Sequence, residues 1–249
     1  MMRFVKKIRV LVMSLVVLSS LALSVSAASP YEPGEIYKRY SIPEGRYILC
    51  RINIQTGMDE KSLDNGETWL VVGGEFDDLK DAWCKDEVRI CYESGIMKGK
   101  TYSKFAPNDP LTNSQVLQIA TRLLGYWNGE QKFFEASSVP IYIQCKDYLI
   151  SNGIDVAKNL YEKPNEVCSR YDFAKMIYKV TPSSYLSAVN QAQEISDTND
   201  ADIQSLYEAG ILAGSETGPI AFEGERGISR GAAAAIIARL VDSECRIIF

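Results

Sequence analysis

Two arginines follow a serine at the same place in two similar stretches of the chain. Arg170 comes directly after Ser169, and Arg230 comes directly after Ser229. A serine of this kind caps the start of a helix, where backbone N–H groups and the helix dipole favour an anion. An arginine in the first turn adds a planar guanidinium that holds a carboxylate through two hydrogen bonds. Both stretches therefore predict an anion site with an arginine that points outward.

A third stretch has Asn113 after Thr112 in the same position. An asparagine can form hydrogen bonds, but it cannot pair with a carboxylate as an arginine does. We therefore expect one or two working sites and not three.

Composition excludes several classes of function. The chain has 249 residues and no histidine, which rules out Ser-His-Asp and Cys-His catalytic groups and His-ligated zinc. The formal net charge of −5 argues against a nucleic-acid binder, for which a basic stripe is typical. With 46% hydrophobic and 24% charged residues, the composition is that of a globular protein. No cofactor and no metal are predicted.

The three stretches belong to a pattern that occurs three times along the chain. A Gly-Ile pair starts at positions 95, 153 and 210, and a helix-start residue stands at 112, 169 and 229. Each copy has the order helix, loop, helix, and one copy alone cannot bury its apolar faces. The expected helices are residues 83–93, 116–124, 142–151, 169–180, 203–209 and 229–241.

Local signals mark where these helices start and stop. Gly95 stands where the residue after a helix turns left-handed. Gln115 lies three residues after Thr112 and predicts a capping box, while Asp172 after Ser169 predicts a looser one.

The first 27 residues have the features of a secretory signal peptide. Four basic residues precede an apolar run at 10–23, and small residues follow at 25–27. The run is shorter than the ~20 residues that cross a bilayer, so we expect cleavage and export without a transmembrane segment in the mature chain. Removal takes away four of the 27 basic residues and changes the formal charge from −5 to −9.

All six cysteines lie after the signal peptide. An exported protein with an even number of cysteines can form disulfides, and 15 pairings are open. Cys84 and Cys91 lie ~10.5 Å apart if they share a helix, which is too far for a bond. The other interpretation is that several cysteines are small buried apolar residues.

Residues 28–74 stand outside the pattern. Residues 47–54 and 69–72 are two apolar runs with β-branched residues, and Asp64-Asn65-Gly66 between them is a turn signal. We predict a small β-hairpin here.

The repeated pattern resembles the S-layer homology domain over about residues 75–242. The first copy has the most motif residues, namely Phe76, Asp78, Trp83, Gly99, Phe105 and Pro107. A Thr-Arg-Ala-Glu element of that family is matched in degenerate form at residues 112–115, 169–172 and 229–232. The copies would then be repeats at 75–129, 130–185 and 186–249.

The resemblance implies a mainly α fold in which three helix-loop-helix repeats form a pseudo-threefold bundle. It also implies non-covalent attachment of an exported protein to a secondary cell-wall polysaccharide on peptidoglycan, often a pyruvylated one, in grooves between repeats. The ligand-binding residues that we expect on this basis are Arg170, Arg230, Asn113, Trp83, Asp78, Asp197 and Gly99.

Simpler interpretations stand beside these. Trp83 stacks on a sugar ring or plugs the start of the first helix, and the plug is favoured because aromatic residues at helical spacing are usually core. Asp78 and Asp197 contact ligand or cap a helix. The rival functions are a cell-wall glycoside hydrolase and a lattice-forming surface protein. We expect a binding module and not an enzyme.

Overall fold

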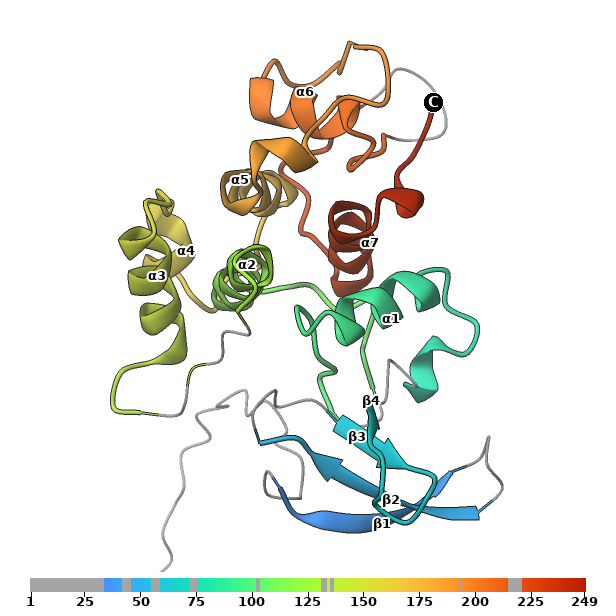
Figure 1. Cartoon of the computed structure of the whole chain (residues 1–249). Helices are drawn as coiled ribbons and strands as arrows, with labels where there is room; N and C mark the ends of the chain where they lie inside the picture. Colours follow the sequence, from blue (N-terminus) through green and yellow to red (C-terminus); the bar gives the residue numbers. More distant parts are fainter. Residues whose placement is uncertain are drawn as a thin grey trace, which may run out of the picture.

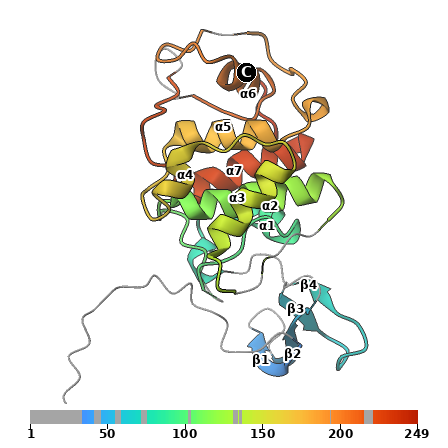
Figure 2. The same ribbon diagram turned by 90° about the vertical axis from the view of Figure 1, so that its left-hand side faces the viewer.

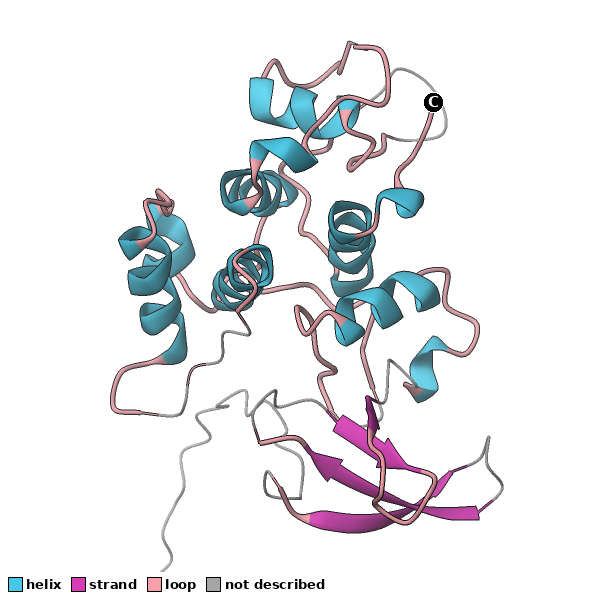
Figure 3. Cartoon of the chain, viewed as in Figure 1, coloured by secondary structure: helices cyan, strands magenta, loops and turns pink. Residues whose placement is uncertain are grey.

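The computed structural model describes residues 34–41, 46–54, 59–71, 76–101, 104–130, 134, 137–192, 194–214 and 221–249. The predicted signal peptide lies outside these residues. The fold is mostly helical, with a small antiparallel sheet at its N-terminal side (Figures 1 and 3). In the part that is described, no helix is long and apolar enough to cross a membrane.

Three helices form the centre of the helical region. They are α2 (Asn113–Trp127), α5 (Arg170–Val180) and α7 (Arg230–Val241). Figure 1 shows them end-on and close together, and Figure 2 shows them running in the same direction across the page. Each starts directly after its predicted cap, so the predicted helix starts are confirmed.

Their caps form the hydrogen bonds that the sequence predicts, with one change. Gln115 Oε1 accepts from the backbone N–H of Thr112 at 3.0 Å. Ser169 Oγ accepts from the N–H of Asp172 at 3.0 Å, but the Asp172 carboxylate accepts from the Ser169 hydroxyl instead of a backbone N–H. Ser229 caps α7 alone, because the residue three positions later is an alanine.

Outer helices surround this centre. They are α1 (Lys85–Glu93), α3 (Ile141–Ser151), α4 (Lys158–Glu162) and α6 (Ala201–Glu208). Single 3-10 turns are found at Asp77–Leu79, Ser183–Tyr185 and Ser243–Cys245. In chain order each outer element precedes one central helix but packs on another: α1 on α7, α3 and α4 on α2, and α6 on α5.

A closed cycle of backbone hydrogen bonds joins the segments that lead into the three central helices. Leu111 N–H donates to Ile228 O at 2.9 Å, Cys168 N–H donates to Leu111 O at 2.9 Å, and Ile228 N–H donates to Cys168 O at 3.1 Å. All three residues are buried. Each of the three segments is therefore held by both of the others.

The helical core is continuous across these elements and includes most of the cysteines. All six cysteines are free thiols, and Cys245 alone among them is partly exposed. The interpretation of the cysteines as small buried apolar residues is therefore confirmed for five of them.

The N-terminal sheet is larger than the predicted hairpin. Its order is β1 (Ile36–Ser41), β2 (Arg46–Ile52), β3 (Asp59–Ser62) and β4 (Leu70–Val71), all antiparallel. The turn at 64–66 is confirmed, with positive φ at Asn65 and Gly66, but it joins β4 to β3 and not to the apolar run in β2. The sequence Asp-Glu-Lys-Ser of β3 has no apolar alternation, so the pattern missed it.

The outer helices α1, α3 and α6 each end on a glycine in the left-handed conformation. Gly95, Gly153 and Gly210 have φ of 74°, 79° and 70°, as predicted for the position after a helix. Their surroundings differ. A Cβ on Gly153 meets nothing within 4 Å, whereas one on Gly210 lies 2.5 Å from Ile247 O.

This difference predicts unequal effects of the same substitution. Gly153→Ala should lower the free energy of unfolding by about 1 kcal/mol, the cost of a left-handed residue with a side chain. Gly210→Ala should cost about 2–4 kcal/mol, because a backbone clash is added. Urea unfolding of both variants checks this, and equal losses would contradict it.

Candidate functional site

Arg230 is buried and does not point outward. Its side chain is 6% exposed, Nε donates to Phe105 O at 2.7 Å, and Nη2 donates to Lys98 O at 2.6 Å. The guanidinium lies 4.5 Å from the centre of the Phe105 ring. Burial lowers the pKa of Arg230 to about 10, which leaves it protonated at neutral pH. Its charge is used to hold a loop of the first copy.

Arg170 and Asn113 have the same kind of partner. Arg170 Nη2 donates to Ala213 O at 3.1 Å, and its guanidinium lies 5.3 Å from the Phe222 ring. Asn113 is 3% exposed, and its Nδ2 donates to the carbonyls of Asn159 and Lys163 at 3.2 and 2.9 Å. At Arg230 the expected outward arginine is therefore corrected, because backbone carbonyls from another part of the chain take its donors. At Arg170 one such carbonyl accepts from Nη2, while Nε is buried without a hydrogen-bond partner among the described residues.

The backbone N–H groups at the three helix starts are also occupied. In α5, the N–H of Arg170 donates to Arg226 O at 2.7 Å and that of Tyr171 donates to Gly224 O at 2.9 Å. The first two N–H groups of α2 donate to carbonyls of residues 166 and 164, and those of α7 to carbonyls of residues 109 and 107. The free N–H groups on which the predicted anion site depends are therefore absent from these helix starts.

Asp197 fixes a loop. Its Oδ1 accepts from the N–H of Phe222 and its Oδ2 from that of Glu223, both at 2.7 Å. The hydrogen bond from Phe222 N–H is the main reason that the pKa of Asp197 is lowered. Glu223 has a φ of 54°, so the carboxylate stabilises a left-handed residue. Asp197 caps no helix here.

Asp78 makes the matching pair of contacts in the first copy. It accepts from the N–H groups of Phe105 and Ala106 at 2.9 and 2.7 Å, and Ala106 has a φ of 59°. Gly99 lies in the same region, where a Cβ would come within 2.4 Å of the Phe76 ring. Asp78 and Gly99 both stabilise the loops of the first copy, and their role in ligand binding stays a prediction.

Trp83 is 65% exposed. The interpretation of Trp83 as a plug in the first helix is therefore wrong. The surface position leaves the ring accessible to a sugar, and that role stays a prediction.

A groove with a volume of about 510 Å³ lies where the start of α5, the turn before α6 and the loop before α7 meet. This size is typical of small-ligand sites. The groove is lined by Tyr171, Asp197, Thr198, Phe222, Glu223, Gly224, Glu225 and Arg226. The predicted site contributes one residue to it, Asp197.

Sequence reasoning missed most of this lining. The motif residues were expected to hold the ligand, but the groove is built mainly from the loop at 222–226, which is outside the motif. A signal was present, because the Glu-Gly-Glu-Arg-Gly run at 223–227 has more charge than the corresponding loops of the other copies.

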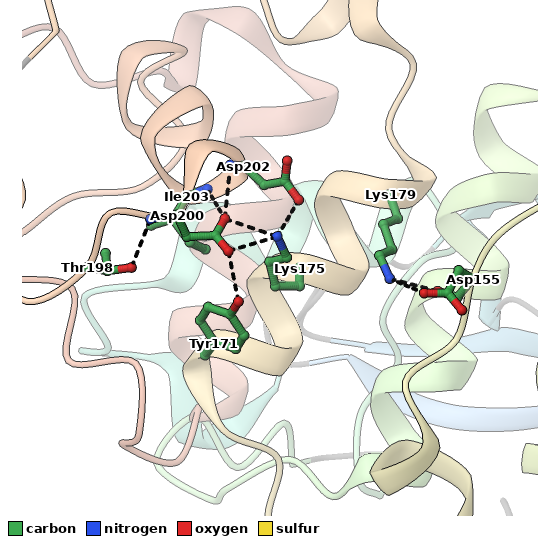
Figure 4. Close-up of polar contacts among 8 residues, drawn as sticks. All are labelled: Asp155, Tyr171, Lys175, Lys179, Thr198, Asp200, Asp202 and Ile203. Carbon is green, nitrogen blue, oxygen red and sulfur yellow. Dashed lines mark hydrogen bonds and ion pairs between the residues drawn. The ribbon is translucent and has the colours of Figure 1, made fainter.

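One wall of the groove is held by a polar cluster between α5 and α6 (Figure 4). Asp200 caps α6 by accepting from the N–H groups of Asp202 and Ile203 at 2.9 and 3.2 Å. Its carboxylate also accepts from Lys175 Nζ at 2.9 and 3.0 Å and from the Tyr171 hydroxyl at 2.8 Å. The same lysine pairs with Asp202. Tyr171 is thereby fixed with its hydroxyl directed toward α6.

The cluster keeps Asp200 ionised. Burial raises the pKa of its carboxyl group, but the hydrogen bonds from Lys175 and Tyr171 outweigh burial and hold the pKa below its ordinary value. Among the residues that the structure describes, no group of three acidic or cysteine side chains is placed to hold a metal ion.

Residues 75–116 match the sequence model of the S-layer homology domain. This part of the chain is therefore similar to an S-layer homology domain. The matched residues include the Asp78 contacts, exposed Trp83, helix α1 and the start of α2. They form the first copy of the pattern and cover less than a fifth of the chain.

Relatives of two kinds share part of this sequence. The Surface-layer 125 kDa protein of Lysinibacillus sphaericus is 35% identical over 111 residues, which are 40% of this chain and 9% of that protein. An endoglucanase of Bacillus sp. (strain KSM-635) is 27% identical over 163 residues, 60% of this chain and 17% of the enzyme. An amylopullulanase of Thermoanaerobacterium thermosulfurigenes is 23% identical over 184 residues, 69% of this chain and 10% of the enzyme. The chain spans less than a fifth of the length of each of these relatives.

Arg230 and Asn113 donate buried hydrogen bonds to backbone carbonyls, so we expect both side chains to stabilise the fold. Arg230→Ala should lower the free energy of unfolding by about 2–4 kcal/mol and Asn113→Ala by about 1–3 kcal/mol, because each leaves two carbonyls unpaired. Arg226→Ala is the matched control, since its exposed side chain predicts a change within about 0.5 kcal/mol. Chemical unfolding measures all three, and an unchanged stability in Arg230→Ala would contradict the assignment.

The Asp200 cluster predicts a pH-dependent effect. Asp200→Asn retains a residue that caps helices well but loses the charge, so we expect about 1 kcal/mol less stability at pH 7. The folded pKa of Asp200 is below the unfolded value of about 3.9. Its contribution is therefore complete well above pH 4 and is lost as the pH falls through the folded pKa.

Unfolding of the native chain and Asp200→Asn at pH 7 and pH 3 checks this. The difference between them should be smaller at pH 3 than at pH 7, because part of the contribution of the charge is lost below the unfolded pKa. Glu162→Gln is the control, because Glu162 is exposed in α4. A difference that is the same at both pH values would refute the role of the charge.

Proposed function

We propose that this chain is an exported protein that attaches to the bacterial cell wall by binding a secondary wall polysaccharide non-covalently. The observation that carries the proposal is the S-layer homology domain at residues 75–116. Export follows from the signal-peptide pattern at residues 1–27. The named surface-layer relative is consistent with a location at the cell surface.

In this proposal the chain contains three S-layer homology repeats, at 75–129, 130–185 and 186–249, around a pseudo-threefold axis. Three observations support it. Leu111, Cys168 and Ile228 form a cycle of equivalent hydrogen bonds. Each segment that ends in one of these residues is followed by a capped central helix. Each outer element packs on the central helix of another segment.

The groove at the start of α5 is the ligand site that we favour. It lies between residues assigned to the second and third repeats, and its volume of about 510 Å³ suits a small part of a polymer. A pyruvylated polymer stays a prediction of the resemblance. Arg170 and Arg230, which were expected to hold its carboxylate, are bonded to backbone carbonyls.

We propose binding without catalysis. The endoglucanase and amylopullulanase share only 17% and 10% of their length with this chain, so their reactions are not transferred to it. A lattice-forming role receives no specific support from the groove or the family match.

Sedimentation with purified bacterial walls tests the proposal. The purified mature chain should pellet with intact walls and stay in the supernatant with walls from which hydrofluoric acid has removed the secondary polysaccharide. Binding should be the same at pH 6 and pH 8, because the chain has no histidine. Equal pelleting with stripped walls would contradict polysaccharide binding, and release of soluble sugar from either wall would contradict a non-catalytic role.

A further inference from the structure

Three aromatic side chains gather at the end of the central helices that lies opposite to the groove. Trp127 is the last residue of α2, and Tyr185 is the last residue of the 3-10 turn that follows α5. Their ring centres are 4.2 Å apart with 35° between the planes, and the Tyr126 ring meets Trp127 edge-on at 5.0 Å. We call Tyr126, Trp127 and Tyr185 the aromatic platform. The groove is at the start of α5, and the 11 residues of that helix, about 16 Å, separate it from the platform.

Two rings of the platform are open to solvent. Tyr185 is 42% exposed and Tyr126 is 39% exposed. Because one face of Tyr185 lies on Trp127, its exposed area is on the outer face and at the hydroxyl. Within the part of the chain that the structure describes, neither tyrosine hydroxyl forms a hydrogen bond. Each hydroxyl is therefore available to a ligand as a donor or an acceptor.

The position of Tyr185 is fixed although its ring is exposed. Its backbone N–H donates to Pro182 O at 2.9 Å, and its carbonyl accepts from Arg246 Nη2 at 2.5 Å. The stacking on Trp127 holds the ring itself. An exposed ring that is held in this way loses little conformational freedom when a ligand binds, which favours recognition by this ring.

Packing alone does not explain the indole of Trp127. Its Nε1 is buried and has no hydrogen-bond partner among the described residues, whereas a buried tryptophan N–H is usually paired. A phenylalanine would pack against the same core without an unpaired donor. The indole adds a broader face under Tyr185, so support of that ring explains the residue type.

The surroundings of the platform indicate an uncharged polar ligand. Apart from the rings, the segments 126–129 and 183–185 consist of serine, asparagine and glycine, and all of these residues are exposed. The cation–π contacts of the described residues lie on other rings. A sugar offers C–H groups to an aromatic face and hydroxyls to a polar rim, and aromatic faces with a few polar groups are typical of sites for such ligands.

We propose that the aromatic platform is a second glycan-binding site, which takes an uncharged sugar ring on the outer face of Tyr185. The hydroxyls of Tyr126 and Tyr185 meet the polar groups of the sugar. The inference goes beyond the proposed function, because the platform shares no residue with the groove beside α5. Two sites at opposite ends of the central helices let the chain hold two glycan segments at once, which raises its overall affinity for a wall.

Nuclear magnetic resonance titration of the nitrogen-15-labelled mature chain tests this site. The probe is an N-acetylglucosamine tetramer, which is uncharged. Its addition should shift the amide signals of residues 126–129 and 183–187 in a saturable way. Binding should change less than about twofold between about 50 and about 500 mM NaCl, because no charge pair is involved. Shifts confined to residues 222–226, no saturable shift at the platform, or a loss of binding at high salt would each overturn the proposal.

Three substitutions of Tyr185 separate the ring face from the hydroxyl and from the fold. Tyr185→Ala should weaken binding of the tetramer about tenfold, because it removes the stacking face. Tyr185→Leu should weaken binding as much, because leucine fills the position on Trp127 without an aromatic face, whereas Tyr185→Phe should lose less than about threefold. Tyr47→Ala is the matched control, since Tyr47 is 70% exposed in β2 of the N-terminal sheet. Full binding by Tyr185→Leu would show that the aromatic face is not used and would overturn the proposal.

Further results separate this site from another occupant and from the proposed function. If sedimentation velocity shows a dimer of the mature chain that Tyr185→Ala disrupts, the platform is an interface between two copies and the proposal is overturned. If the chain pellets with intact walls but the platform does not bind the tetramer, this inference fails and the wall-binding function stands. If the tetramer binds with the predicted variant effects but the chain does not pellet, the second site is supported and the wall-binding function fails.

Discussion

The closed cycle of hydrogen bonds among Leu111, Cys168 and Ile228 is the constraint on which the helical region depends. Each central helix starts one residue after the cap that follows this cycle, and its first N–H groups donate to carbonyls of another segment. Burying a helix start without such partners would leave several donors unsatisfied. No central helix can therefore keep its buried start without the loop of a neighbour.

The same constraint also decides which groups the side chains at the three helix starts contact. Arg170, Arg230 and Asn113 stand where a ligand contact was expected, but their donors stabilise loops that a neighbouring segment contributes. This use is favourable because a guanidinium or amide can pair with buried carbonyls that would otherwise be left unpaired. The groove is lined instead mainly by the loop at 222–226, whose side chains take no part in closing the cycle.

The sequence predicts local features well and long-range ones less well. Serine and threonine caps and the glycines after helices depend on a few neighbouring residues, so Ser169, Ser229 and Gly153 are placed correctly. The direction of Arg230 depends on carbonyls more than 120 residues away in the chain, and no local pattern contains that information. Trp83 shows the same limit, since helical spacing predicts a face but not what covers it.

The packing of α1 on α7 determines how a mechanical force on the N-terminal side is transmitted through the helical region. The N-terminal sheet precedes α1, and α1 packs on the last central helix and not on the central helix that follows it in the chain. Tension applied through the sheet therefore passes across the α1–α7 contact into the C-terminal helix before it can extend the segments between them. The contact between α1 and α7 therefore makes the two ends of the helical region resist such a pull together.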